Sequence, residues 1–366
     1  MNKKISEPLV RIAKRDSLVW WKAYLIRLVS VVMALIVSAV VIFAITKLNP
    51  LAVYGSMYRG AFGTTGKTWN TIRDAMILLC ISVGLSPAFK MRFWNIGAEG
   101  QILIGGLVTA ACMMYFKSMP TVLLLIVMFV TSCIAGALWG LLPAIFKAKW
   151  DTNETLFTLM MNYVAIYLTS FFVDFWDKKQ SHSVGIINLD TGKGWFPRLF
   201  GEQYILNVII VALLAIGMYF YLKTSKHGYE IAVVGESENT ARYAGINVKK
   251  VIIRTMLISG AICGVAGFVE VAGVSHTIST STAGGRGFTA IIVAWLAKFN
   301  SLTMTLISFL LVFLDKGAAQ IASDFNLNEY ASEMVTGIIL FFILGSEFFI
   351  NYRLILRGKH KEVAAK

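Results

Sequence analysis

The sequence contains few charged residues. Only 15% of its 366 residues are Asp, Glu, Lys or Arg, whereas 57% are hydrophobic. A soluble domain carries about 25% charged residues, so the composition excludes an ordinary soluble protein and indicates a surface that mostly faces lipid. Apolar runs long enough to cross a bilayer core of about 30 Å recur along the chain. We therefore predict an all-α, polytopic membrane protein with about ten transmembrane helices.

Cysteine and histidine are also scarce, with four residues of each. The cysteines all fall within apolar runs and lack metal-ligand spacing, and the histidines lie far apart in the sequence. We predict neither a metal site nor another cofactor. The sequence shows no nucleophile–base pattern, which argues against a membrane-embedded enzyme. The longest segment between spans on the predicted cytoplasmic side, 223–250, is too short for a catalytic domain, so any ATPase must be another chain.

Ten apolar runs define the predicted spans. They are 28–46, 72–89, 93–115, 121–146, 154–175, 204–222, 251–274, 287–299, 302–322 and 333–350. With the N-terminus in the cytoplasm, most of the 34 Lys and Arg residues fall on the cytoplasmic side, as the positive-inside rule requires. Both termini are then cytoplasmic. The net charge of +14 thus predicts contact with anionic membrane lipids rather than with nucleic acid.

Three regions follow from these spans. Residues 1–27 form a cytoplasmic amphipathic N-terminal segment, residues 28–350 a transmembrane domain, and residues 351–366 a basic cytoplasmic tail. Residues 61–68 match a relaxed phosphate-binding loop, with Ala61 in place of the first glycine. Such a loop needs a buried strand before it and a helix after it, whereas this one lies between two predicted spans. We interpret it as a turn, and predict no ATP site.

The polar segment 95–101 interrupts an apolar run. Asn95, Glu99 and Gln101 lie there among glycines, and a charge at the bilayer centre costs at least about 2.5 kcal/mol. Asn95 and Glu99 share a face of a continuous helix, whereas Gln101 points elsewhere. Two interpretations remain open. These side chains either hold helices together or line a transport path.

A second polar site lies in the span that follows Thr152 and Asn153, either of which is a good N-cap. Asn162 and Tyr163 lie about 14 Å further along the helix axis, near the middle of the membrane. The same two interpretations apply to them.

In the segment 279–299, residues 279–290 are rich in Ser, Thr and Gly, and only a short apolar run, 291–297, follows them. This predicts a re-entrant or broken helix, which is tolerated at membrane depth only when it is buried in protein or lines a cavity. In transporters, glycine-interrupted short segments in corresponding positions of two halves mark the substrate path. The segments containing Glu99 and Phe288 lie in opposite halves of the chain. We therefore include Phe288 among the path candidates.

The predicted cytoplasmic segment 223–250 contains a short helix over 236–244, which Gly245 would end. The segment is either a solvated loop or a docking helix for a soluble partner. The candidate coupling residues are Glu236, Asn239, Arg242, Tyr243 and Gly245.

Four stretches together resemble a known family. They are 95–101 (NIGAEGQ), 153–163 (NETLFTLMMNY), 228–248 (GYEIAVVGESENTARYAGINV) and 285–302 (GRGFTAIIVAWLAKFNSL). In this order they are similar to the permease subunits of ABC importers of the ribose and branched-chain amino acid branch, most of all to nucleoside or simple-sugar permeases. The resemblance covers about 28–350. Two departures are Trp94, before Asn95, and 295–298, where the family usually has small and apolar residues ending in Gly.

The resemblance implies a transport mechanism. A lipid-anchored substrate-binding protein would deliver a nucleoside to the outer face of the cell membrane, and this chain and a second permease paralogue would enclose the path. A separate ATP-binding subunit would drive alternating access by pressing on 228–248. A rival hypothesis is an ion-coupled secondary transporter in which Glu99, Glu270 or Asp315 carries protons or pairs with sodium. Another is an ABC permease for simple sugars.

Overall fold

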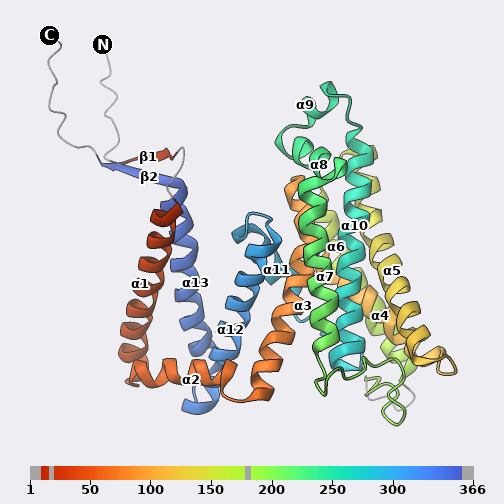
Figure 1. The fold of residues 1–366 in the computed structure, drawn as a ribbon, viewed down its shortest axis with the longest axis horizontal. Coiled ribbons are helices and arrows are strands. Elements are labelled where there is room, and N and C mark those ends of the chain that lie inside the picture. The colour runs from red at the N-terminus through yellow and green to blue at the C-terminus, as the bar shows by residue number, and fades with distance from the viewer. Residues whose placement is uncertain (1–9, 16–19, 178–182, 357–366) are drawn as a thin grey trace. The chain divides into compact units, whose positions relative to one another are not determined.

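The computed structural model describes residues 10–15, 20–177 and 183–356. Helices dominate it (Figure 1). Within the described residues, seven helices are long and apolar enough to cross a membrane. Three shorter apolar helical stretches, Leu28–Ala44, Arg286–Leu296 and Met334–Ile350, accompany them. The predicted all-α polytopic fold is confirmed. The chain divides into two compact units, a larger one of Thr64–Val312 and a smaller one of Met1–Gly63 and Phe313–Lys366.

The larger unit is built around α10. Its elements are α3 (Thr65–Lys90), α4 (Ala98–Tyr115), α5 (Thr121–Trp150), α6 (Glu154–Trp176), α7 (Ile205–Thr224), α8 (Lys226–Glu236), α9 (Glu238–Tyr243), α10 (Val248–Glu270), the π-helical turn η1 (Val271–Ser275), α11 (Arg286–Leu296) and the first part of α12 (Ser301–Phe325). Helix α10 packs against α3, α4 and α5. In the most apolar stretch of each helix, 83% of the residues are buried in α3 and 78% in α4 and in α10. The buried share is only 22–28% in α5, α6 and α7. The latter three form the outer wall.

Glycines set the distance between α5 and α10. A Cβ atom added at Gly264 would clash with the carbonyl oxygen of Ser132, and one at Gly260 or Gly136 would clash with the backbone of the facing helix. Small residues spaced four apart let two membrane helices approach until their backbones touch. The two helices therefore gain packing contacts along their length, and α10 is held at the centre of the unit.

The smaller unit contains the two ends of the chain. Its elements are β1 (Val10–Lys14), α1 (Trp20–Thr46), α2 (Pro50–Phe62), the rest of α12 from Phe313, α13 (Glu329–Asn351) and β2 (Tyr352–Leu356). Helices α1 and α13 pack together, and β1 and β2 pair antiparallel, with Val10 opposite Leu356. Ser56 Oγ donates a hydrogen bond of 2.5 Å to Asp324 Oδ2, which joins α2 to α12. Neither the strand pair nor α2 was predicted from the sequence.

Several predicted boundaries differ from the structure. Helix α1 already begins at Trp20, before the predicted run 28–46, and α4 begins at Ala98, after the predicted start at 93. The predicted helix 236–244 is interrupted because Ser237 ends α8 and caps α9 through a hydrogen bond from Thr240 N. Helix α11 has 11 residues, which span only about 16 Å. This length agrees with the predicted broken or re-entrant helix.

Two local predictions are confirmed. The Asn153 side chain caps α6 by accepting a hydrogen bond of 3.0 Å from Leu156 N. Gly245 follows α9 with φ of 76°, and Ile246 N bonds to Ala241 O, as expected of a glycine that ends a helix. Residues 61–68 form the end of α2, a turn and the start of α3, rather than the strand and helix that flank a phosphate-binding loop.

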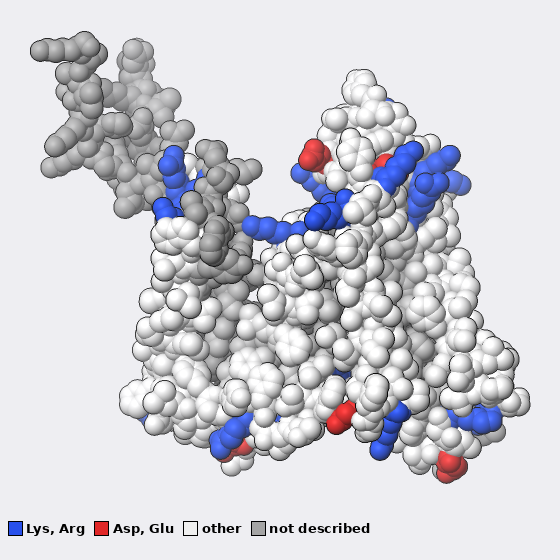
Figure 2. Space-filling view, viewed as in Figure 1, with Lys and Arg blue, Asp and Glu red and all other residues white. Residues whose placement is uncertain are grey.

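Charged side chains lie toward the two ends of the larger unit. Figure 2 shows Lys and Arg at the end that carries α8 and α9 and again at the opposite end, with a wall almost free of charge between them. Such an uncharged band is what the hydrocarbon core of a bilayer requires.

Candidate functional site

The connection between α3 and α4 is non-helical backbone in which Asn95 and Gly97 are buried. Ile96 N donates a hydrogen bond of 3.1 Å to Thr158 Oγ1, and Asn162 Nδ2 donates one of 2.9 Å to Ile96 O. The Asn162 Oδ1 atom accepts a bond of 2.9 Å from Gly100 N. Backbone groups without a helical partner must be satisfied by other groups at membrane depth. Asn162 provides such partners on both sides of the start of α4, for Ile96 O before it and for Gly100 N in its first turn. It therefore anchors the connection to α6.

Asn95 and Gln101 face each other, and both are buried. The Asn95 amide nitrogen donates to Ser259 Oγ on α10 at 3.2 Å, and each of the two side-chain amides donates to the other at 3.4 Å. The expectation that Asn95 shares a face with Glu99 while Gln101 points elsewhere is wrong. It assumed one continuous helix, whereas Asn95 lies before the start of α4.

Glu99 binds the first turn of α11. Its Oε1 accepts a hydrogen bond of 2.7 Å from Gly285 N, and its Oε2 accepts one of 2.9 Å from Gly287 N. The side chain is in the first turn of α4 and is buried. The first N–H groups of a helix lack intrahelical partners, and the positive end of the helix dipole favours an anion there. Glu99 therefore serves as the N-cap of a helix distant in sequence, which accounts for a carboxylate inside an apolar region.

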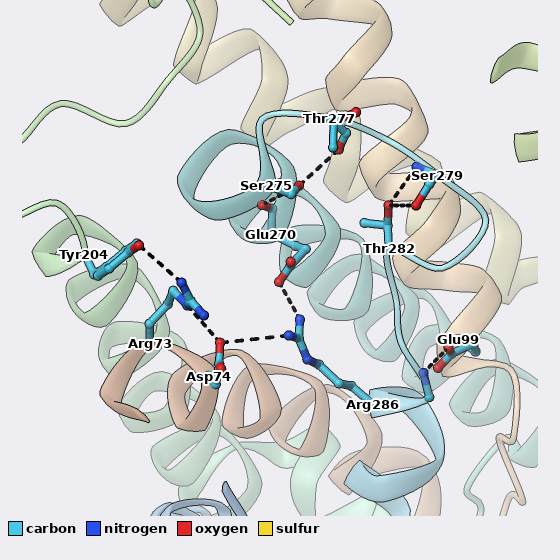
Figure 3. Close-up of polar contacts among 11 residues, drawn as sticks. Arg73, Asp74, Glu99, Tyr204, Glu270, Ser275, Thr277, Ser279, Thr282 and Arg286 are labelled. Atoms are coloured by element: carbon cyan, nitrogen blue, oxygen red, sulfur yellow. Dashed lines mark hydrogen bonds and ion pairs between the residues drawn. The ribbon is translucent and has the colours of Figure 1, made fainter. Parts of the chain in front are cut away.

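A network of four charged residues lies on the other side of the α11 start (Figure 3). Arg286 donates to Glu270 at 2.6 Å and lies 3.9 Å from Asp74, which accepts a bond of 2.8 Å from Arg73. Arg73 also lies 3.2 Å from the Tyr204 hydroxyl. Two guanidinium groups thus face two carboxylates, and each buried charge has a partner of opposite sign, which offsets part of the desolvation cost.

The sequence interpretation had not selected this network. The sequence did contain a sign of it, because two adjacent charged residues, Arg73 and Asp74, lie in the apolar run 72–89. Glu270 is the last residue of α10. With Glu99 on one side and the Glu270–Arg286 pair on the other, the start of α11 is connected to α3, α4 and α10.

Tyr163 and Phe288 do not belong to the buried polar groups. Their exposed fractions are 53% and 44%. Phe288 follows directly on Gly287, so its ring projects from the same turn of α11 that Glu99 caps. Tyr163 lies on α6 next to Asn162. The structure therefore separates the path candidates into four buried, hydrogen-bonded residues and two exposed aromatic residues.

The coupling candidates lie on or beside the short helices α8 and α9. Tyr243 is 94% exposed, and Arg242 forms an ion pair of 3.4 Å with Glu238. A cavity of about 240 Å³ lies beside them, lined by the residues that join α8 to α9 and by the ends of α3, α5 and α6. Glu236 contributes to its wall, and so do Arg92 and Lys147. Within the described residues, no group of three or more His, Cys, Asp or Glu is placed to hold a metal ion.

Comparison with known proteins identifies the family. A family described as the permease component of the branched-chain amino acid transport system matches residues 68–344. The chain belongs to this permease family. The permease is 28% identical to the glucose ABC transporter permease protein TsgB13 of Haloferax volcanii, over 91% of this chain and 90% of the relative. No solved structure matches the chain.

Two further relatives carry nucleoside names. The guanosine ABC transporter permease protein NupP of Bacillus subtilis is 29% identical over 88% of this chain and 93% of its own length. The nucleoside ABC transporter permease protein NupB of Lactococcus lactis is 25% identical over 87% of this chain and 90% of its own length. These matches and the apolar helices make the permease a multi-pass membrane protein and a subunit of an ABC transporter.

Proposed function

We propose that this permease is the membrane-spanning subunit of an ABC importer for nucleosides. The observation that carries the proposal is the match, along nearly the whole chain, to relatives named as guanosine and nucleoside permeases. A relative of similar identity is named as a glucose permease, so simple sugars are the second candidate substrate. Nucleosides and sugars share a ring with hydroxyl groups, and only nucleosides add an aromatic base.

The structure suggests how the proposed path is built. We place it beside the starts of α4 and α11, where Asn95, Glu99, Gln101 and Asn162 hold two interrupted segments in position. Because these four side chains already have hydrogen-bond partners within the chain, we assign them to positioning rather than to direct contact with substrate. The exposed Phe288 ring offers a stacking surface for a base, and Tyr163 offers a second aromatic ring with a hydroxyl.

The partners follow from the family and from the architecture. Membership in the ABC permease family implies a separate ATPase and a second permease chain. We place the ATPase against α8 and α9, since Asn239, Arg242 and the exposed Tyr243 lie there and Gly245 ends the second helix. Both chain termini and this segment would face the cytoplasm of a cell membrane. ATP would bind the ATPase alone, and a lipid-anchored binding protein would deliver substrate to the opposite face.

Ion coupling has less support from the geometry. A carboxylate that carries protons must be able to gain and lose one during transport. Glu99 instead accepts two backbone hydrogen bonds, and Glu270 is paired with Arg286. Protonation of either residue would break contacts that hold the start of α11. These two acids therefore fit a structural role better than a proton relay.

The decisive experiment is uptake by the complete transporter in proteoliposomes. Labelled guanosine or uridine should accumulate only with ATP inside, on the side of the ATPase, and an uncoupler should leave the rate unchanged. Labelled glucose serves as the matched alternative substrate. Uptake of glucose but not of nucleosides would replace the proposed substrate. Uptake that requires an ion gradient and not ATP would contradict the ABC mechanism.

A test of Phe288 addresses the proposed base contact. Phe288→Tyr preserves the aromatic face and should retain nucleoside uptake. Phe288→Leu should raise the KM by at least about fivefold, because base–aromatic stacking contributes about 1–3 kcal/mol. Equal KM values in the two variants would remove Phe288 from the substrate path.

A further inference from the structure

Two tryptophans at which the sequence departs from the family pattern meet in the structure. Trp94 precedes the polar segment 95–101, and Trp295 begins the segment 295–298. Their indole rings stack with centroids 5.2 Å apart and an angle of 22° between the planes. Trp94 lies in the connection between α3 and α4, whereas Trp295 lies in the last turn of α11. The stack therefore joins the end of α11 to this connection.

Two phenylalanines pack against the tryptophan pair. Phe89, near the end of α3, is 1% exposed, and its ring centroid lies 6.0 Å from each indole. Phe299 stacks on Phe89 at 6.5 Å and contacts Trp295 at 5.2 Å. Aromatic pairs at such distances attract each other beyond the burial of their surface. The four rings thus bind the end of α11 and the turn after it to α3 and to Trp94.

The same connection leads to the residue that holds the other end of α11. Glu99, in the first turn of α4, accepts hydrogen bonds from Gly285 N and Gly287 N at the start of α11. Helix α11 spans only about 16 Å, so one short stretch of chain, residues 94–99, contacts it at both ends. We call this stretch the clamp.

The clamp has little slack between its two contacts. Ile96 N donates to Thr158 Oγ1 at 3.1 Å, and Asn162 Nδ2 donates to Ile96 O at 2.9 Å. A Cβ atom at Gly97 would lie only 3.1 Å from the Cβ atom of Thr158, so the backbone also packs closely on α6. A stretch held in this way transmits a displacement of its base instead of absorbing it.

Helix α8 lies directly on the base of the clamp. A Cβ atom at Gly235 would clash with the carbonyl oxygen of Lys90 and would lie 3.3 Å from Met91 Cα. The backbone of α8 therefore touches the end of α3, just before the residues that lead to Trp94. Ile231 in α8 is fully buried. A force on α8 thus acts on the chain that enters the clamp.

We propose that Trp94 is a positioning residue for transport, because it and Glu99 hold both ends of α11 and make this helix follow the movement of α8. Coupling between distant sites is carried by such packed side chains and hydrogen bonds between rigid elements. Phe288 lies on α11, so the position of its ring in the proposed path follows α8 as well. The inference rests on the placement of the ATPase against α8 that is proposed above.

The test uses the complete transporter in nanodiscs. Hydrogen–deuterium exchange of peptides from α8 and α11 is measured with and without ATP and vanadate, which trap the ATPase. Trp94→Leu removes the stacking ring, Trp94→Phe keeps an aromatic ring, and Trp295→Leu removes the partner. Trp150→Leu is the matched control, because Trp150 ends α5, is 63% exposed and makes its ring contact, with Phe146 at 5.1 Å, within α5. The second readout is the ATP hydrolysed per molecule imported, with guanosine or glucose, whichever the unmodified transporter takes up.

Without nucleotide, Trp94→Leu should speed exchange in the last turn of α11 about two- to tenfold, the effect of one aromatic pair, while exchange in α5 stays unchanged. Trapping should alter exchange in α8 and α11 of the unmodified transporter but only in α8 of Trp94→Leu, and this variant should use more ATP per molecule imported. Trp94→Phe and Trp150→Leu should resemble the unmodified transporter. Trp94→Leu and Trp295→Leu together should cost no more than either alone, because contacting residues are not additive.

The proposal is overturned if α11 of Trp94→Leu exchanges and responds to trapping as in the unmodified transporter. It is also overturned if Trp94→Phe is as impaired as Trp94→Leu, or if the effects of Trp94→Leu and Trp295→Leu add. An α8 peptide that does not respond to trapping in the unmodified transporter would contradict the placement of the ATPase, and exchange without nucleotide would still decide whether Trp94 holds α11.

Discussion

Replacement of Glu99 by Ala tests whether this carboxylate holds the start of α11. In the structure its two oxygens accept hydrogen bonds from Gly285 N and Gly287 N at 2.7 and 2.9 Å. Both bonds are lost in Glu99→Ala. Glu99→Gln keeps one acceptor oxygen and places an NH₂ group opposite the second N–H. Glu99→Ala therefore removes two hydrogen bonds from the start of α11, and Glu99→Gln removes one.

The magnitude follows from the charge and the burial of Glu99. A hydrogen bond to a charged group contributes about 1.5–3 kcal/mol, so Glu99→Ala should lower the free energy of opening of α11 by about 3–6 kcal/mol. Glu99→Gln should lower it by about half of that amount. Each 1.4 kcal/mol is a factor of ten, so amide exchange in α11 should accelerate about 100-fold or more in Glu99→Ala.

Hydrogen–deuterium exchange of the peptide that contains α11 measures this opening, and nucleoside uptake measures its consequence. Uptake should fall in the order unmodified, Glu99→Gln, Glu99→Ala while the subunits remain assembled. Glu154→Gln is the control, because Glu154 also lies in the first turn of a helix but pairs with Lys147 at 3.1 Å. If α11 exchanged equally fast in Glu99→Ala and in the unmodified chain, the capping role would be refuted.

Three other changes probe the packing, the ionic network and the coupling segment. Gly264→Ala should destabilise the fold by about 1–3 kcal/mol through overpacking, measured as a lower unfolding midpoint, whereas Gly217→Ala should not, because a Cβ there meets nothing within 4 Å. Arg286→Met leaves the Glu270 carboxylate buried without its partner and should cost about 3 kcal/mol; adding Glu270→Gln should restore part of the loss, and no restoration would disprove the pairing. Arg242→Glu should uncouple ATP hydrolysis from uptake without loss of assembly, and a normal ratio of ATP hydrolysed to nucleoside imported would disprove the docking role.

Local features of the sequence predicted local features of the structure. Asn153 caps α6 and Gly245 ends α9 because capping depends on residues at most a few positions away. The same kind of signal was overlooked at Asn49 and Pro50, where Asn49 caps α2 and Pro50 occupies its first turn. The boundary of α4 was misplaced because residues 93–97 are apolar enough to continue a span, yet their backbone bonds to Thr158 and Asn162 instead.

The polar residues show the limit of such reasoning. The sequence identified Glu99 as unusual but left open whether it packs helices or lines a path. Its partners are 186 and 188 residues away, and no spacing rule connects them. Arg73 and Arg286 likewise share Asp74 only because α3 and α11 pack together.

The sequence by itself determined that this chain is an all-α membrane protein, because crossing lipid requires long apolar runs and satisfied backbones. Its ordered motifs also indicated the permease family. Only the tertiary structure decided what the buried polar groups do. Glu99 caps α11, and Asn162 anchors the start of α4. The physical reason is that a buried polar group is defined by its partner, and partners from distant helices meet only when the helices pack.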